Sequence, residues 1–422
     1  MRELEAGWSL RETALDNLAR RNLLGFLEAI WSIPIYEGID FLLYDIVFSG
    51  QEKLPFRKHE LAQAKQLANK CDEIEPTAYA GTLFLHDMKT GVVTGSERNT
   101  NILQKVIALA WVAFFQTQNA FFSEAGKSFD EARGLAHGLK GPHYRAQCHA
   151  ILALFEANSN LKEDACFDIR TTVDLINEPS NELSHSESND KLFCYSILML
   201  VLKILGDQSL LSEICSKAIH EVEENYYCFE LWQLGIVLQT LVRLGRIGEA
   251  HRLLAKVPFP RGIDEVTEAM DGPEMGPQSI HESTDAYSTF AIELTRLGKL
   301  DDAKTILQQI PLDGERSGAY ADVAFYLLSA SRSSDHQNDL KSAISIYSDS
   351  RLSRNEHIFD VAYMLVRLGL KKEFFAFLLL KISYLTDAPR IGALLARMYP
   401  KKAERIREAV VDVLQDYNEV RN

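Results

Sequence analysis

Apolar residues recur at intervals of three and four along almost the whole chain, while the alternation expected of a half-buried strand is nearly absent. Such spacing places the apolar side chains on one face of a helix. The first segment predicts a helix over residues 10–31, which ends before Pro34 because a proline disfavours helical backbone at the residue preceding it. The pattern therefore predicts an all-α protein.

One apolar pattern returns three times: an alanine, a bulky residue four positions on, and a small or aliphatic residue three positions further. The copies are Ala125-Phe129-Ala132, Ala250-Leu254-Val257 and Ala303-Leu307-Ile310. The phrase Arg-Leu-Gly precedes two of them, at residues 243–245 and 296–298, and occurs again at 367–369. Steps of four and three keep each trio on one helical face. A repeated face with a repeated turn predicts an α-solenoid of stacked antiparallel helix pairs that forms a right-handed superhelix.

The polar segments divide this helical pattern into regions. We expect an irregular helical N-terminal region at residues 1–98 and helix pairs at 99–178. A polar, serine-rich linker or loop should follow at 179–190, and further helix pairs should occupy 191–422. Two insertions interrupt the last region. One is a Gly-, Pro- and acid-rich stretch at 259–283, and the other lengthens an inter-helix turn at 331–338.

Composition narrows the choice of partner and compartment. The chain of 422 residues carries a net charge of −14, so we expect neither a nucleic acid nor a membrane surface as its main partner. Apolar runs stay below the ~18 residues that a membrane span requires, and the N-terminus lacks the apolar core of a signal peptide. The six cysteines form no CxxC pair and are typical of a reducing compartment. These features predict a cytoplasmic protein.

Motifs that carry chemistry are sparse. A loose group of His and Cys side chains has no metal-ligand spacing, because Cys148 and His149 are adjacent and point in different directions on a helix. The group contains His137, His143, Cys148, His149 and Cys166. The sequence also lacks GxSxG, GxGxxG and GxxxxGK[ST] motifs. We therefore predict no metal, no cofactor and no catalytic residues.

The alanine-centred units resemble the tetratricopeptide repeat. That repeat has a small residue in its first helix, then a turn, then an alanine, a bulky residue and a second small residue in its second helix. One unit carries Ala113, Ala125, Phe129 and Ala132, and another carries Tyr287, Ala291, Leu294, Gly298, Ala303 and Leu307. The resemblance implies that the second helices form an outer, structural layer. The first helices would then line a concave face that holds a peptide.

Projecting the repeat frame onto the first helices gives a candidate peptide-binding groove. Its residues are Trp232, Gln239, Ser288, Ile292, Thr295, Phe359 and Arg367. The alternative is that these side chains pack against the helix of the next unit. The places of the family's carboxylate clamp hold Ile107, Ala110 and Phe114, so the resemblance implies a hydrophobic or mixed groove.

The expected function is a protein–protein interaction module, a scaffold, adaptor or chaperone that binds a protein or peptide. One alternative is a peptide-responsive bacterial regulator, in which an N-terminal helical bundle acts under the control of a repeat domain. A second is an enzyme that uses an acidic site of unfamiliar pattern.

Overall fold

The structure is a computed structural model of the 422-residue chain. It describes residues 21–31, 55–70, 96–139, 141–178, 185–224, 231–256, 277–310 and 388–411, with scattered residues between 316 and 375. Every regular element in these residues is a helix, which confirms the all-α prediction. The chain divides into two compact units, Met1–Phe229 and Glu230–Asn422.

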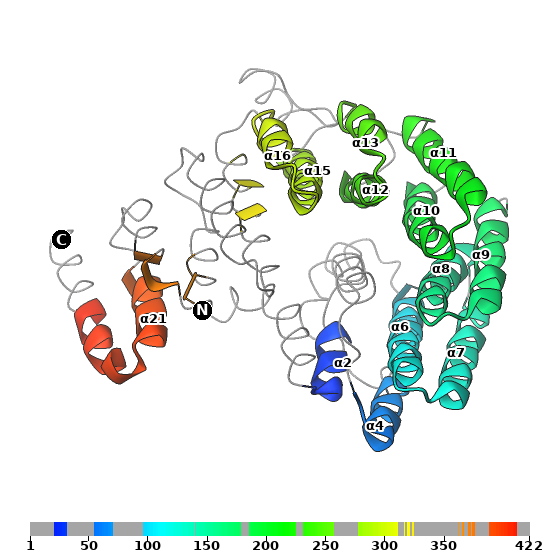
Figure 1. The fold of residues 1–422 in the computed structure, drawn as a ribbon, viewed down its shortest axis with the longest axis horizontal. Coiled ribbons are helices and arrows are strands. Elements are labelled where there is room, and N and C mark those ends of the chain that lie inside the picture. The colour runs from blue at the N-terminus through cyan, green and yellow to red at the C-terminus, as the bar shows by residue number, and fades with distance from the viewer. Residues whose placement is uncertain are drawn as a thin grey trace. The chain divides into compact units, whose positions relative to one another are not determined.

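The first unit is a row of helix pairs (Figure 1). Helix α6 packs against α7, α8 against α9, and α10 against α11, while α8 contacts both α6 and α10. Helix α4 packs on α6, and α2 packs on α4. The bounds are α2 (Leu23–Trp31), α4 (Lys58–Ala68), α6 (Ser96–Gln118), α7 (Phe122–His137), α8 (Pro142–Asn158), α9 (Lys162–Asn177), α10 (His185–Leu205) and α11 (Gln208–Glu224). Stacked pairs of this kind are the arrangement of an α-solenoid.

Two helices begin inside segments that the sequence predicted to be irregular. Helix α6 begins at Ser96, and α10 begins at His185, within the predicted linker 179–190. Ser, Asn and Asp are poor helix-interior residues, but like Glu they are well accommodated in a first turn, where backbone N–H groups need acceptors. Polarity at these two places therefore marks the start of a long helix.

The second unit repeats the pairing. Helix α12 packs against α13 and α15, and α15 packs against α16. The bounds are α12 (Leu231–Arg243), α13 (Ile247–Leu254), α15 (Pro277–Arg296), α16 (Leu300–Leu307), α21 (Ala388–Met398) and the 3₁₀ turn η5 (Pro400–Lys402), which leads into helical residues 403–411. Helix α15 thus includes the last part of the insertion predicted at 259–283. The rest of that insertion and the one at 331–338 lie outside the described residues.

The same turn closes the first helix of five pairs. A residue with φ between 61° and 78° ends each helix: Ala120, Asn160, Gly206, Gly245 and Gly298. The next residue donates its backbone N–H to the carbonyl five positions back, as Arg246 does to Leu241 at 2.8 Å. This is the hydrogen bond of a Schellman motif. The same bond joins Leu370 to Leu365 beside the third Arg-Leu-Gly.

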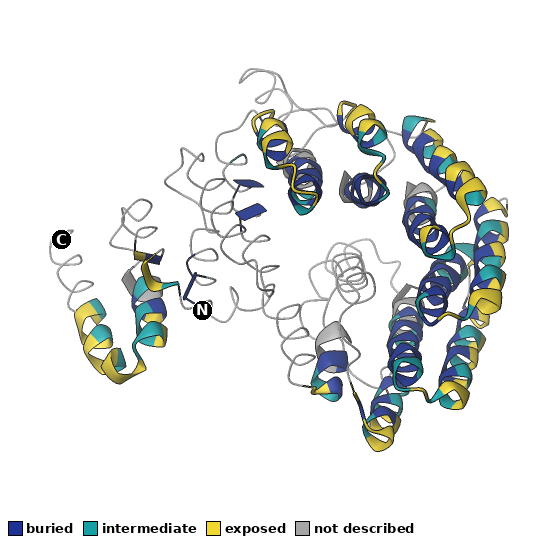
Figure 2. Ribbon diagram, in the orientation of Figure 1, coloured by how far each residue is buried: buried dark blue, intermediate teal, exposed yellow. Residues whose placement is uncertain are grey.

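The alanine trios are buried as the pattern predicted. Ala125, Phe129 and Ala132 are 0–2% exposed, as are Ala250 and Leu254, and the third trio is 0% exposed throughout. Val257 lies outside the described residues. In the first unit, α7, α9 and α11 each turn one face to solvent, whereas the middle of α6, α8 and α10 is buried on all sides (Figure 2). The trio of α7 thus faces inward from one of the helices that carry the exposed surface of the first unit.

Replacing Ala303 with leucine should lower the free energy of unfolding by roughly 1–3 kcal/mol, because the added methyl groups would overpack a fully buried helix contact. Thermal unfolding measures the change. The matched control is Lys304→Leu, which adds a leucine at the neighbouring position, where the side chain is only partly buried. An unchanged midpoint for Ala303→Leu would show that this alanine tolerates a larger side chain.

Candidate functional site

A buried charge cluster joins the three helices α7, α8 and α9. Arg133 of α7 lies 2.6 Å from Glu156 Oε1 and 3.1 Å from Asp168 Oδ2. On the other side, His149 Nδ1 lies 2.5 Å from Asp168 Oδ1. Glu156, His149 and Asp168 have no exposed surface, and the Arg133 side chain is 16% exposed. We call these four residues the α7–α9 charge cluster.

The two carboxyl groups of this cluster differ in protonation. Burial, together with the neighbouring charge of Asp168, raises the pKa of Glu156 to about 10. Burial also acts to raise the pKa of Asp168, but hydrogen bonds with His149, Glu156 and Arg133 outweigh it and hold that pKa below its ordinary value. Glu156 Oε2 is buried and accepts no hydrogen bond. Protonation resolves this, because a neutral Glu156 can donate from Oε2 to Asp168 while Oε1 accepts from Arg133.

The α7–α9 charge cluster is an internal feature of the helix stack. A carboxylic acid beside a carboxylate is an arrangement that acid–base enzymes use, but such groups must reach a substrate. Here both carboxyl groups are fully enclosed. The cluster therefore ties three helices together, and the alternative of an acidic catalytic site gains no support from it.

Part of the predicted loose His and Cys group lies at this cluster, since His149 belongs to it. The rings of His137 and His149 are 5.2 Å apart, and burial raises the pKa of the Cys148 thiol well above its ordinary value. Among the described residues, no three His, Cys, Asp or Glu side chains converge in a way that could hold a metal ion.

A second buried cluster lies between α12 and α15 in the other unit. Glu293 accepts hydrogen bonds from Arg243, at 2.9 and 3.1 Å, and from Gln239 and Arg296, both at 2.8 Å. The side chains of Arg243 and Glu293 are only 3% and 2% exposed. We call these four residues the Glu293 cluster. Gln239, one of the residues predicted to line a peptide groove, is hydrogen-bonded within this cluster.

The other groove residues are mostly enclosed or outside the description. Ser288 and Thr295 are 4% and 8% exposed, Gln239 is 6% exposed, and Ile292 is partly buried. For these buried side chains the structure supports the alternative, packing inside the stack, because α12 and α15 lie against each other. The side chain of Trp232, as well as Phe359 and Arg367, lies outside the described residues. The clamp positions Ile107, Ala110 and Phe114 are also buried.

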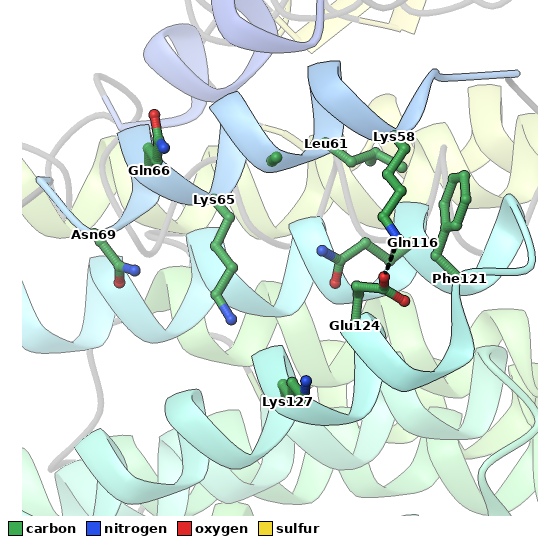
Figure 3. Close-up of a pocket in the computed structure, with 10 residues that line it drawn as sticks. Lys58, Leu61, Lys65, Gln66, Asn69, Gln116, Phe121, Glu124 and Lys127 are labelled. Carbon is green, nitrogen blue, oxygen red and sulfur yellow. Dashed lines mark ion pairs between the residues drawn. The ribbon is translucent and has the colours of Figure 1, made fainter.

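An open pocket lies in the first unit between α4 and the α6–α7 pair. It has a volume of about 320 Å³. Its lining residues are Lys58, Leu61, Ala62, Lys65, Gln66, Asn69, Gln116, Phe121, Glu124 and Lys127. Figure 3 shows Lys58 and Lys65 of α4 reaching toward Gln116 of α6 and toward Glu124 and Lys127 of α7. We call this the lysine pocket.

Local sequence explains why these side chains converge. Lys58 and Lys65 are seven residues apart, so they lie on nearly the same face of α4, two turns from one another. Phe56, just before α4, is 5% exposed and packs edge-on against Phe115 of α6, with ring centroids 5.2 Å apart. The Phe56 N–H also donates to Asn119 Oδ1 at 2.9 Å. These contacts fix the start of α4 beside the turn from which α7 begins.

The electrostatic balance of the lysine pocket is positive. Its lining contains three lysines and one glutamate, an excess of two positive charges. Lys58 Nζ lies 2.5 Å from Glu124 Oε1, and the ammonium group of Lys58 lowers the pKa of Glu124 through this contact. Lys65 pairs at 2.9 Å with Glu131, which lies outside the lining. A positive pocket is a local exception on a chain with net charge −14.

Sequence reasoning missed the lysine pocket. Residues 1–98 were predicted to be irregular helical structure, and Lys58 and Lys65 of α4 were given no weight, because their partners on α7 follow more than 60 residues later. The only usable signal was the spacing of Lys58 and Lys65 on a helix with Leu61 on its buried side.

Comparisons with known proteins give no family. No family model matches the chain, and no curated protein matches it. Among solved structures, Ton1535 from Thermococcus onnurineus NA1 is 14% identical, with a TM-score of 0.32 over 98% of this chain and 99% of that chain. A circular tandem repeat protein with novel repeat topology and enhanced subunit contact surfaces is 12% identical, with a TM-score of 0.26 over 97% and 88%. Similarities this low carry no argument about this chain.

No helix within the described parts of the chain combines the length and the apolar character needed to cross a bilayer.

Proposed function

We propose that this protein is a tetratricopeptide-like interaction module that binds a protein or peptide partner. The observation that carries the proposal is the lysine pocket, which opens at the junction of α4 with the α6–α7 pair. Its volume lies at the lower end of the range of ligand sites in proteins, which suits a few side chains of a larger partner.

The distribution of polar groups supports a binding role. The two buried clusters spend their charges on contacts between helices, and their carboxyl groups are enclosed. By contrast, the ammonium groups of the lysine pocket stand at an accessible surface, with Lys58 69% exposed. The charges of the two buried clusters are used within the protein, whereas those of the lysine pocket are accessible. Accessible charges in an open pocket are suited to recognising a partner.

Filling the lysine pocket should abolish capture of a partner from native lysate by the full chain. Ala62 is an exposed residue of α4 in the lining, so Ala62→Trp would block the space without touching the core. The matched control is Gln63→Trp, the adjacent exposed position of α4, which lies outside the lining. Quantitative mass spectrometry of retained proteins is the measurement.

Loss of a protein with Ala62→Trp and its retention with Gln63→Trp would support the proposal. Equal retention by both, with loss in Trp232→Ala, would move the site to the first-helix groove. If the wild-type chain retains no protein above a blank matrix, the proposed function is wrong.

A further inference from the structure

We infer that the lysine pocket binds a compact anionic group, a phosphate or a pair of carboxylates, and that Glu124 competes with this group for Lys58. The inference rests on the proposed function and names the chemistry of the group that the module would hold. The shared chemistry of the two ligands is negative charge concentrated within a few ångströms, which the three lysines of the lining favour even though Lys58 and Lys65 already have carboxylate partners.

The lysines are not equally engaged by the protein itself. Among the described residues, Lys127 has no ion-pair partner, and its side chain is exposed. Lys58 is held by Glu124, and its ammonium group also lies 5.8 Å from the centre of the Phe121 ring. An exposed pair of this kind contributes little free energy, so an incoming anion can replace it at low cost.

Gln116 supplies a fixed donor at the base of the pocket. Its side chain is 96% buried, since the residue is 4% exposed, and its Oε1 accepts a hydrogen bond of 2.9 Å from the buried Ser128 hydroxyl. The same hydroxyl also lies 3.1 Å from the Glu124 carbonyl oxygen, and the Gln116 amide faces the pocket between Lys65 and Glu124 with its Nε2 group (Figure 3). A preoriented amide donor beside lysines is a feature of sites that hold oxyanions.

The start of α7 adds a favourable field. Phe121 is the N-cap residue and its side chain cannot cap the helix, while Glu124 lies in the first turn. Negative charge is favoured at such a helix end. Glu124 already exploits this position through its pairing with Lys58, which is why we regard its carboxylate as an internal substitute for the ligand.

The test is direct binding to the full chain, with isothermal titration of inorganic phosphate, succinate and a peptide carrying adjacent aspartates as probes. We expect saturable binding of at least one probe. Lys127→Gln should weaken it about tenfold, the effect of one charge-assisted hydrogen bond. Glu124→Gln should strengthen it, because the competitor for Lys58 is removed. Phosphate alone, or the dicarboxylate and peptide alone, would identify the source of the anion.

The matched control is Lys217→Gln on α11, an exposed lysine paired with Glu213 at 2.8 Å. It should bind like the wild type. If no probe binds saturably, or if Lys217→Gln weakens binding as much as Lys127→Gln, the inference is wrong. A partner captured from lysate that is lost with Ala62→Trp would still support the proposed function in that case, so the two can fail separately.

Discussion

Replacing Glu293 with glutamine should lower the free energy of unfolding of the second unit by about 3–5 kcal/mol. The change removes the carboxylate that Arg243 contacts at 2.9 and 3.1 Å, and this guanidinium, whose side chain is 3% exposed, loses that buried counter-charge. Removing one member of a buried pair is far more costly than the pair's net contribution, because the remaining charge has lost both water and partner. Arg296, whose side chain is 11% exposed, lies 2.8 Å from Glu293 Oε1 and would also lose this charged contact, which adds to the destabilisation.

Hydrogen exchange of the α12 and α15 amides is the suitable measurement, because a chain of two units need not unfold in one step. The matched control is Glu249→Gln, which breaks an Arg246–Glu249 pair of 3.2 Å whose side chains are 27% and 34% exposed. That pair should contribute at most about 1 kcal/mol. Equal effects of the two substitutions would show that burial does not govern the Glu293 cluster.

The helix pairs were predictable because their signal is local. The trio Ala125-Phe129-Ala132 spans less than three turns, and burial at its three positions follows from helical spacing alone. The turns were only partly predictable. Gly245 and Gly298 mark two of them, but Ala120 and Asn160 adopt the same left-handed backbone without glycine. A left-handed backbone at alanine costs about 1–2 kcal/mol of local strain. Since no glycine marks this position, the sequence does not reveal the turn.

The candidate site was not predictable because it depends on separations that no local pattern encodes. Gln239 and Glu293 are 54 residues apart, and the segment between them includes the whole insertion predicted at 259–283. Periodicity assigned Gln239 to a helix correctly but could not say which neighbour would cover it. The lysine pocket likewise needs α4 to settle beside α7, a contact fixed by Phe56 and Phe115.

Replacing Asp168 with asparagine should lower the free energy of unfolding of the first unit by about 3 kcal/mol at pH 7, the lower end of the range for breaking a buried pair. Asp168 is the enclosed carboxylate that balances Arg133 in the α7–α9 charge cluster, since Glu156 is neutral at this pH. The exposed Asp130, 3.1 Å from Arg133, remains as a weaker counter-charge in the variant. An asparagine carries no negative charge, and it places an N–H donor where one of the two carboxylate oxygens was, so it cannot accept from both His149 and Arg133 as the carboxylate does. Hydrogen exchange of α8 and α9 amides measures the loss.

The matched substitution Glu156→Gln should not lower the free energy of unfolding of the first unit at neutral pH. Glutamine has the shape of a protonated glutamate, with an oxygen to accept from Arg133 and an N–H to donate to Asp168. In the wild type the folded chain keeps a proton on Glu156 that the unfolded chain releases above its ordinary pKa of 4.5. Because the folded-state pKa is raised, this contribution to stability is fully present below 4.5 and is lost progressively as pH rises above it.

Glu156→Gln has no group that titrates at this position. The free energy of unfolding of the variant, relative to that of the wild type, should therefore rise from pH 5 to pH 8. Asp168 has the reverse dependence: its lowered pKa means that its contribution is present at neutral pH and is lost as pH falls below 3.8. A Glu156→Gln chain that lost as much stability as Asp168→Asn at pH 8 would mean that both carboxyl groups are ionised. That result would contradict the hypothesis that a proton on Glu156 allows the two enclosed carboxyl groups to lie beside Arg133.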